Sequence, residues 1–344
     1  MIQKTVRIQD VARAAGVSTA TVSRALSNPG ILSEGTRKAV QDAIRETGYR
    51  VNKAARNLRK QRAGAVLVLV PNLGNPFFSQ ILAGISARFS GTDYAVLIKD
   101  TDGFAGGPGA LVEYFLDARV DGIISLDGGL NAGQLAAFSD HGVDGRVVFA
   151  CEWVHDCPLP SVRSDNVTGA QLAVRHLHGL GHRKIAHVTG PEGNVLTAAR
   201  REGMLAERDR LGLPAHPDWI MRGDFSMESG QAAAQRIIAM DERPTAVFCA
   251  SDMVAFGLIA TLTEAGVRVP QDISVIGFDD IEMSQFYIPA LTTIRQNRRR
   301  LGVRATELLL DRLEGEITAA PDVGLVELVG VALIERASTA APRA

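Results

Sequence analysis

Residues 8–26 read Ile-Gln-Asp-Val-Ala-Arg-Ala-Ala-Gly-Val-Ser-Thr-Ala-Thr-Val-Ser-Arg-Ala-Leu, and their apolar spacing predicts two short helices joined by a tight turn. The first helical pattern stops at Gly16, a residue that readily takes the left-handed conformation that ends a helix. Ser18 stands where it can cap a second helix over residues 19–27. Two helices with a short glycine-containing connection are typical of the helix-turn-helix motif.

The second helix of such a motif enters the major groove of DNA with its first side chains at the base edges. Thr19 can hydrogen-bond there, Ala20 can contact a thymine methyl, and Arg24 can make a forked contact to guanine. A plain surface charge is the alternative for Arg24. Three further polar residues of the DNA-binding set are expected to cap the helix or bind phosphate: Ser18, Thr21 and Ser23.

The charge of the chain is unevenly distributed. The 344 residues carry a net charge of −1, yet residues 1–62 hold thirteen Lys or Arg against four Asp or Glu. The remaining chain is correspondingly acidic. A basic head suits a protein that binds the phosphate backbone, although a solvated basic tail would have the same charge. The tail is disfavoured because a third helix is expected between Ser33 and Gly48, completing a small core.

These residues carry a family resemblance. Residues 8–26, followed by Thr36-Arg37 and Gly48-Tyr49, resemble the headpiece of the lactose/purine repressor (LacI-type) family. The resemblance implies a transcriptional repressor whose headpiece, residues 1–50, binds palindromic double-stranded operator DNA as part of a homodimer. One departure is Arg7, where family members carry a small hydroxyl residue that caps the first helix.

Residues 51–63 are basic and too short to form a stable helix alone. They resemble the family's hinge helix, which implies that Leu58 wedges into the minor groove and kinks the duplex. Val51 departs from the proline usual in the family and leaves the helix entry less pre-organised. The other hinge residues expected near DNA are Ala54, Ala55, Arg56, Asn57 and Arg59.

Strand-like apolar runs alternate with helical segments from residue 65 onward, which predicts parallel sheets covered on both faces. Expected strands lie near 65–70, 94–98, 122–126, 147–150, 184–188, 246–250 and 273–278, and expected helices near 77–89, 109–119, 132–141, 168–180, 198–211, 227–240 and 252–266. Two such series indicate two similar lobes with a ligand between them, at the carboxyl ends of the strands. The predicted fold is therefore a small all-α helix-turn-helix headpiece plus an α/β two-lobed domain with two doubly wound parallel sheets.

The body resembles the same family through about residue 338, in stretches such as 75–78 and 269–280. The resemblance implies a periplasmic-binding-protein-like domain for effector binding and dimerisation over residues 64–338, with three crossovers between lobes. The expected N-lobe covers about 64–163 and 293–322, and the expected C-lobe about 164–292 and 323–338.

A sugar-like effector needs hydrogen-bond partners for its hydroxyls and an apolar plate for a ring. Asp279 ends a buried strand and could accept two hydroxyls, and Arg200 is a forked donor. Phe77, Phe78 and Phe225 could supply ring faces, with core packing as the alternative for the first two. Each matches a family ligand position.

The effector is expected to be a nucleoside. Asn194 and Leu196 stand where purine repressors carry arginine and threonine, so contacts to a free purine are missing. The chain looks most like the cytidine-responsive branch, and Glu152 also matches that branch and could accept from a base amino group. A free pentose or hexose is the alternative effector, and corepressor logic is the alternative to induction. The different-class alternative is a periplasmic-type solute-binding protein without the basic head.

Other functions find little support. The chain lacks G-x-G-x-x-G after a strand, G-x-S-x-G and H-E-x-x-H, so neither an enzyme nor a cofactor is expected. The histidines at 176, 178, 182 and 187 are poorly spaced for a metal and are expected to be solvated or to cap helices. The chain shows no signal-peptide pattern, no membrane-length apolar run and an odd cysteine count, which favours the cytoplasm. A dimer is expected rather than a tetramer, because no heptads follow Arg336.

Overall fold

The computed structural model describes residues 6–50, 57, 62–103, 106–107, 109–315 and 324–343. The chain divides into two compact units, Met1–Ala63 and Gly64–Ala344, and each has a hydrophobic core of its own. Most of the predicted hinge lies outside the described residues, namely Val51, Ala54, Ala55, Arg56, Leu58 and Arg59.

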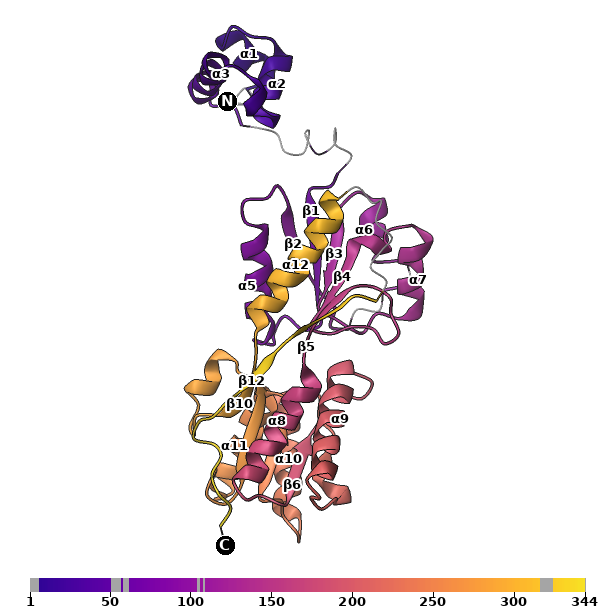
Figure 1. Ribbon diagram of the computed structural model, residues 1–344, viewed down its shortest axis with the longest axis vertical. Coiled ribbons are helices and arrows are strands. Elements are labelled where there is room, and N and C mark those ends of the chain that lie inside the picture. The colour runs from indigo at the N-terminus through magenta and orange to yellow at the C-terminus, as the bar shows by residue number, and fades with distance from the viewer. Residues whose placement is uncertain are drawn as a thin grey trace. The chain divides into compact units, whose positions relative to one another are not determined.

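The first unit is a three-helix domain (Figure 1). Its elements are α1 (Ile8–Ala14), α2 (Thr19–Ser27), η1 (Pro29–Ile31) and α3 (Glu34–Thr47). Gly16 and Gly48 have φ angles of 65° and 66°, and Ser18 and Ser33 cap the helices that follow them. A small core fills the centre, formed by Val11, Ala12, Val22, Val40 and Ala43. The predicted helix-turn-helix is therefore confirmed.

Arg7 makes no side-chain cap for α1. Asp10 compensates from inside the helix, because its Oδ2 accepts a hydrogen bond from the backbone N–H of Arg7 at 2.9 Å. This is one half of a capping box, and it offsets the missing hydroxyl cap.

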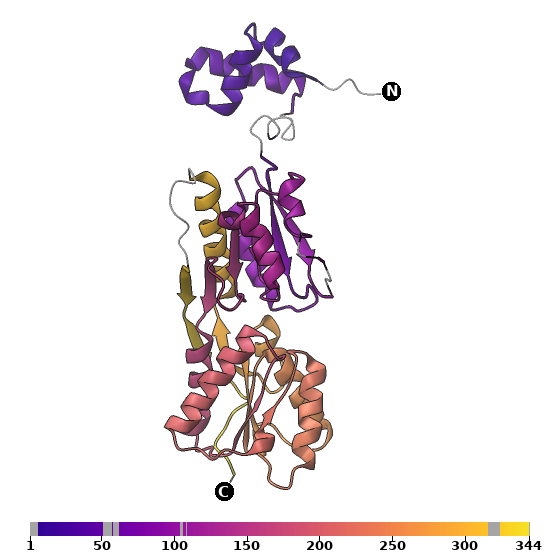
Figure 2. The ribbon, with the colours of Figure 1, turned by 90° about the vertical axis from the view of Figure 1, so that its right-hand side faces the viewer.

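The second unit holds two six-stranded sheets (Figure 2). The N-lobe sheet has the order β11-β5-β4-β3-β1-β2 and the C-lobe sheet the order β12-β10-β9-β8-β6-β7. The strands are β1 (Ala65–Val70), β2 (Ala95–Asp100), β3 (Gly122–Ser125), β4 (Val147–Ala150), β5 (Ser161–Ser164), β6 (Ile185–Val188), β7 (Ile220–Met221), β8 (Ala246–Cys249), β9 (Ser274–Asp279), β10 (Thr292–Gln296), β11 (Val326–Val329) and β12 (Val331–Ile334). All described pairings are parallel except that of β10 with β12, so two parallel doubly wound lobes are confirmed.

Helices cover both faces of each sheet, as expected for buried parallel strands. They are α5 (Phe78–Phe89), α6 (Glu113–Leu116), α7 (Ala132–Asp140), α8 (Asn166–Gly179), α9 (Val195–Arg210), α10 (Met227–Ala239), α11 (Asp252–Glu264) and α12 (Arg298–Glu314), with short turns η2 (Asp144–Arg146), η3 (Pro217–Trp219) and η4 (Glu282–Gln285). In β1, Val66 and Val68 join the core beneath α5 and α12, whereas Leu67 and Leu69 join the core on the other side.

The chain crosses between the lobes three times, as expected from the resemblance. The crossings follow β5, β10 and β11, and the segments run together between the sheets (Figure 1). Two predicted lobe bounds need correction. β10 belongs to the C-lobe sheet and β11 to the N-lobe sheet, although residues 293–322 were expected in the N-lobe and 323–338 in the C-lobe. The first of these crossings passes from β10 through Asn297 directly into α12, and the second lies at Gly330 between β11 and β12.

The buried histidines differ from expectation. His182 and His187 are buried rather than solvated or capping. His182 pairs through Nδ1 with Thr245 Oγ1 at 2.9 Å and through Nε2 with the carbonyl of Ala340 at 2.8 Å. It therefore fastens the C-terminal segment to the C-lobe, a long-range role that local spacing does not reveal.

Candidate functional site

The first candidate site is the exposed start of α2. Thr19, Ala20 and Arg24 all have exposed side chains. Ser18 and Thr21 are engaged locally, because Ser18 Oγ accepts from the N–H of Thr21 at 3.1 Å and lies 2.9 Å from Thr21 Oγ1. The capping role predicted for Ser18 is therefore confirmed. Ser23 is half-buried next to these residues.

Asn57 is the one described residue of the predicted hinge set. Its backbone carbonyl accepts from the N–H of Arg62 at 3.0 Å, and its side-chain Nδ2 donates to the carbonyl of Ala63 at 3.2 Å. In this structure its amide therefore closes a local turn.

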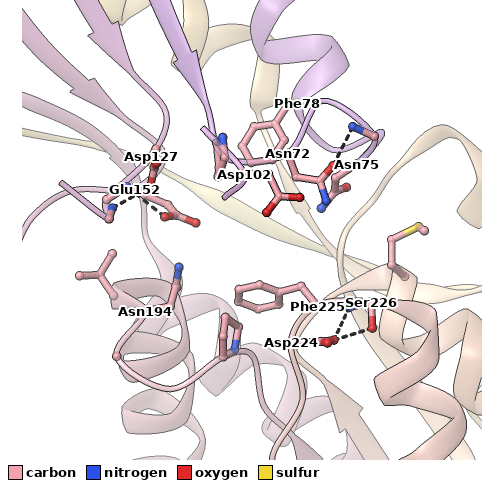
Figure 3. A pocket seen from close by; sticks show the side chains of 18 of the residues that line it. Asn72, Asn75, Phe78, Asp102, Asp127, Glu152, Asn194, Asp224, Phe225 and Ser226 are labelled. Carbon is pink, nitrogen blue, oxygen red and sulfur yellow. Dashed lines mark hydrogen bonds between the residues drawn. The ribbon is translucent and has the colours of Figure 1, made fainter. Parts of the chain in front are cut away.

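The second candidate site is a cleft between the two lobes of the Gly64–Ala344 unit, with a volume of about 770 Å³ (Figure 3). Loops at the carboxyl ends of the parallel strands line it, which is where ligands of such sheets bind. From the N-lobe come Asn72, Asn75, Phe78, Asp102, Asp127 and Glu152, and from the C-lobe Glu192, Asn194, Asp224, Phe225, Ser226, Glu228 and Met253.

A smaller cavity of about 30 Å³ adjoins the cleft. The two cavities share Asn75, Phe78, Glu152 and Phe225, and the smaller one adds Phe77, Leu196, Arg200, Ser251 and Asp279. With Asn194 on the cleft itself, all seven predicted effector residues therefore gather around one connected site.

Arg200 lies at the floor of this site and is 2% exposed. Its Nε donates to Asn166 Oδ1 at 2.9 Å, and its Nη1 donates to the carbonyl of Ala250 at 2.5 Å. Its guanidinium stacks on the ring of Phe278 at 3.9 Å. Arg200 is thus rigidly held, with part of its donor fork already engaged by the protein.

Asp279 ends β9 beside Arg200, whose Nη1 lies 3.8 Å from Asp279 Oδ1. Gln296 Nε2 donates to the same carboxylate oxygen at 2.7 Å. Burial raises the pKa of Asp279 to about 7, because desolvation disfavours the charged form more than Arg200 favours it. The backbone of Asp279 also has a φ of 128°, a strained value of the kind that concentrates at functional sites.

Glu152 and Asn194 face each other from opposite lobes (Figure 3). Glu152 accepts from the N–H of Gly128 at 3.1 Å, and burial raises its pKa while the Asn194 amide partly lowers it. Asn194 Oδ1 caps α9 by accepting from the N–H of Leu196 at 2.8 Å, so its amide N–H₂ is the group directed to the cleft. An acceptor and a donor therefore face each other across the cleft.

The aromatic residues serve the cleft in different ways. Phe225 is half-buried, with a φ of 69°, and its ring lies against Gly190, where an added Cβ would come within 2.2 Å of the ring. Phe77 and Phe78 are 5% and 6% exposed and pack edge to face within the N-lobe core. They combine core packing with lining of the site, so the two alternatives from the sequence coexist.

Sequence reasoning missed most of the polar lining, in particular Asn72, Asn75, Asp102, Asp127, Asp224 and Glu228. All of these residues except Glu228, which lies in the first turn of α10, are in loops without a motif. The signal that could have found several of them is position, because Asp102 and Asp127 lie two residues beyond the ends of strands β2 and β3.

The described residues contain no group of three or more His, Cys, Asp or Glu side chains placed to hold a metal ion. Within the same residues, every helix is too short or too polar to cross a bilayer.

Family models match both parts of the chain. The model described as "Bacterial regulatory proteins, lacI family" matches residues 7–52, and that described as "Periplasmic binding protein-like domain" matches residues 174–339. Among curated relatives, the HTH-type transcriptional repressor CytR of Escherichia coli K12 is 37% identical over 97% of this chain and 96% of its own. The HTH-type transcriptional repressor PurR of Aliivibrio salmonicida is 34% identical over 89% of this chain and 92% of its own.

Solved structures are also similar to this chain along most of its length. The lac repressor dimer bound to operator and the anti-inducer ONPF has a TM-score of 0.84 at 31% identity, covering 98% of this chain and 100% of that chain. A LacI family transcriptional regulator from Enterococcus faecium with bound ribose has a TM-score of 0.71 at 29% identity, covering 81% of this chain and 100% of that chain.

Proposed function

The chain belongs to the lacI family of bacterial regulatory proteins and is a DNA-binding transcriptional repressor, and from this premise we propose that a nucleoside binds its cleft and acts as the inducer. The family consists of transcriptional regulators rather than enzymes. Because this chain belongs to a family that binds operator DNA, we propose that it acts in the cytoplasm.

The pairing of Glu152 with Asn194 carries the nucleoside proposal. A nucleoside has a flat base whose edge presents donors and acceptors, and a ribose with vicinal hydroxyls. The Glu152 carboxylate would accept from a base amino group while the Asn194 amide donates to a neighbouring ring atom. Phe225 would stack on a ring face, and Asp279 with Arg200 would hold the ribose hydroxyls.

A free pentose or hexose is the second candidate effector. The relative from Enterococcus faecium was solved with bound ribose, and its match covers 81% of this chain. The groups proposed here for ribose, Asp279 and Arg200, would serve a free sugar equally well. The cleft volume of about 770 Å³ leaves space beyond a single pentose, which favours the larger nucleoside.

On the DNA side, we assign base contacts to Thr19, Ala20 and Arg24 because they are the exposed early residues of α2. The lac repressor structure is a dimer on operator, and this chain exposes apolar side chains that a dimer could cover. Leu97 and Ile98 are 41% and 49% exposed on the edge strand β2, and Phe286 and Ile288 are 74% and 89% exposed after η4. We propose that these patches are buried in a homodimer that binds a palindromic operator.

The proposed mechanism couples the two sites through lobe closure. A nucleoside that contacts Glu152 from one lobe and Asn194 from the other draws the lobes together, which changes how the N-lobes of the dimer meet. The hinge segments that follow the two headpieces then separate, and operator affinity falls by a coupling free energy of roughly 1–3 kcal/mol. A corepressor would reverse the sign of this coupling.

Isothermal titration of the full chain against cytidine, adenosine, ribose and glucose tests the effector. The proposal expects binding of a nucleoside with higher affinity than ribose, because the base contributes the Glu152 and Asn194 contacts. Binding of a sugar alone would remove the nucleoside proposal and favour the second candidate.

A further inference from the structure

The lining of the cleft is strongly acidic. Its carboxylates are Asp102, Asp127, Glu152, Glu192, Asp224 and Glu228, and its described lining includes no Lys, Arg or His. Three of these residues are labelled on the N-lobe side in Figure 3, with Asp224 opposite them. A ligand placed here therefore meets negative charge from both lobes.

Little within the cleft neutralises this charge. Glu192 pairs with Arg222, which lies outside the cleft lining. Hydrogen bonds from Ser226 hold the pKa of Asp224 below its usual value, so its charge is stabilised. Arg200, in the adjoining small cavity, is balanced by Asp279 at 3.8 Å.

Other basic side chains line a neighbouring cavity and are not part of the cleft lining. A separate cavity of about 660 Å³ lies on the other side of the 190–195 loop and is lined by His155, Arg201 and Arg222. Glu192 and Asn194 line both cavities, but these three basic residues line only the second one. The loop thus divides an acidic cavity from a basic one.

Two of the helix N-termini at the cleft, those of α9 and α10, are already capped by side chains. Free N–H groups at a helix start are a common anion site. Here Asn194 caps α9 through the N–H groups of Leu196 and Thr197. Ser226 caps α10 through the N–H of Ser229, and Glu228 places a carboxylate in the first turn of that helix.

We propose that the cleft is charge-selective: it accepts an uncharged or cationic effector and rejects the phosphorylated form of the same molecule. The inference rests on the proposed function, because it concerns the same cleft, and it narrows the effector to a nucleoside rather than a nucleotide, or to a free sugar rather than a sugar phosphate. A phosphate dianion would face several carboxylates, with no Lys, Arg or His among the described residues that line the cleft. Such repulsion is only partly screened inside a protein cleft.

Matched pairs of ligands test this with the full chain: cytidine against cytidine 5′-monophosphate, and ribose against ribose 5-phosphate, by isothermal titration at pH 8. In whichever pair the unphosphorylated ligand binds, the phosphorylated ligand is expected to bind at least ~30-fold more weakly. Added salt is expected to reduce this ratio, because it screens the charges. Equal or tighter binding of a phosphorylated member overturns the inference.

Variants separate charge from shape. Asp102 and Glu228 are exposed, and their carboxylates accept no hydrogen bond from the described residues, so D102N/E228Q removes charge without removing a structural contact. We call the ratio of the affinities of the unphosphorylated and phosphorylated ligands the phosphate penalty. D102N/E228Q is expected to reduce this ratio at least ~3-fold, because two of the repelling charges are gone. The matched control D140N/E264Q removes two exposed carboxylates outside the cleft and is expected to leave the penalty unchanged. If neither added salt nor D102N/E228Q changes the phosphate penalty, the phosphate is excluded by its size rather than by its charge. That result would overturn the charge mechanism.

The ligand pairs also keep the two proposals apart. If the chain binds ribose but not cytidine, the effector is not a nucleoside. Charge selection would still be supported in that case if ribose 5-phosphate binds more weakly than ribose. Binding of both cytidine and its monophosphate with equal affinity would support the nucleoside and contradict charge selection.

Discussion

Asp279 shows how burial tunes one side chain for its proposed ligand. Its carboxylate is held by Gln296 and lies near Arg200, yet burial raises its pKa to about 7. The ionised form accepts hydrogen bonds on both oxygens, which suits two ribose hydroxyls, whereas the protonated form turns one oxygen into a donor and binds them less well. Cytidine is therefore expected to bind about tenfold more weakly at pH 6 than at pH 8, because its binding must first release a proton from Asp279. Titration calorimetry across this range measures the effect, and pH-independent affinity would contradict it.

Replacing the same residue separates the two sites. Asp279→Ala is expected to abolish the response to cytidine while leaving operator affinity unchanged, so the variant represses constitutively. Without a ligand, the carboxyl of Asp279 has a raised pKa in the folded chain. The free energy of unfolding of the wild type is therefore expected to fall, relative to that of the Asp279→Ala variant, as pH rises from about 4 to 7. A variant that responds normally to inducer would show that the ligand lies elsewhere.

Arg24 is the residue of α2 most suited to base recognition, since it is exposed and can form a forked contact. Arg24→Ala is expected to weaken operator binding by about 1–3 kcal/mol, or roughly 5–150-fold, and to relax sequence preference. Arg13→Ala, an exposed arginine on α1, is the matched control and should change affinity only slightly. Fluorescence anisotropy with operator and scrambled duplexes measures both, and equal losses on the two duplexes would indicate a phosphate contact instead.

At the scale of elements, the apolar pattern and the helix caps predicted those strands and helices whose formation depends mainly on residues close in sequence. The run Ala65–Val70 is buried along its whole length, and α2 begins and ends where Ser18 and the apolar spacing placed it. Strands such as β5 (Ser161–Ser164) and β10 (Thr292–Gln296) were missed because their residues are largely polar and their pairing is long-range. The site followed the same rule: Asp279 ends an obvious strand, whereas Asp224 lies in a loop whose position only the tertiary fold decides.

The hinge assignment stays a prediction from resemblance, because Leu58 lies outside the described residues. Leu58→Ala is expected to weaken operator binding through loss of the minor-groove wedge and to leave cytidine affinity unchanged. Parallel anisotropy and calorimetry on one preparation measure both affinities. Unaltered operator affinity would contradict the wedge.

At the scale of the whole molecule, the exposed apolar residues predict self-association. Ile288 is 89% exposed, so Ile288→Asp should cost the monomer little stability while it weakens the proposed dimer. Leu116 is 59% exposed on α6 in the N-lobe, and Leu116→Asp is the matched control. Sedimentation velocity should show a dimer for wild type and the control, with a shift toward monomer for Ile288→Asp. A wild-type monomer would contradict the proposed assembly.

The central claim is that the basic first unit binds DNA and that the two-lobed unit controls this binding. The most direct test selects duplexes from a random pool with the full chain and then titrates the selected duplex, with and without cytidine, by fluorescence anisotropy at moderate salt. The account predicts selection of a palindromic sequence, release of that duplex by cytidine, and loss of selective binding when residues 1–63 are deleted. Failure to select any sequence, or selective binding by the truncated chain, would contradict it.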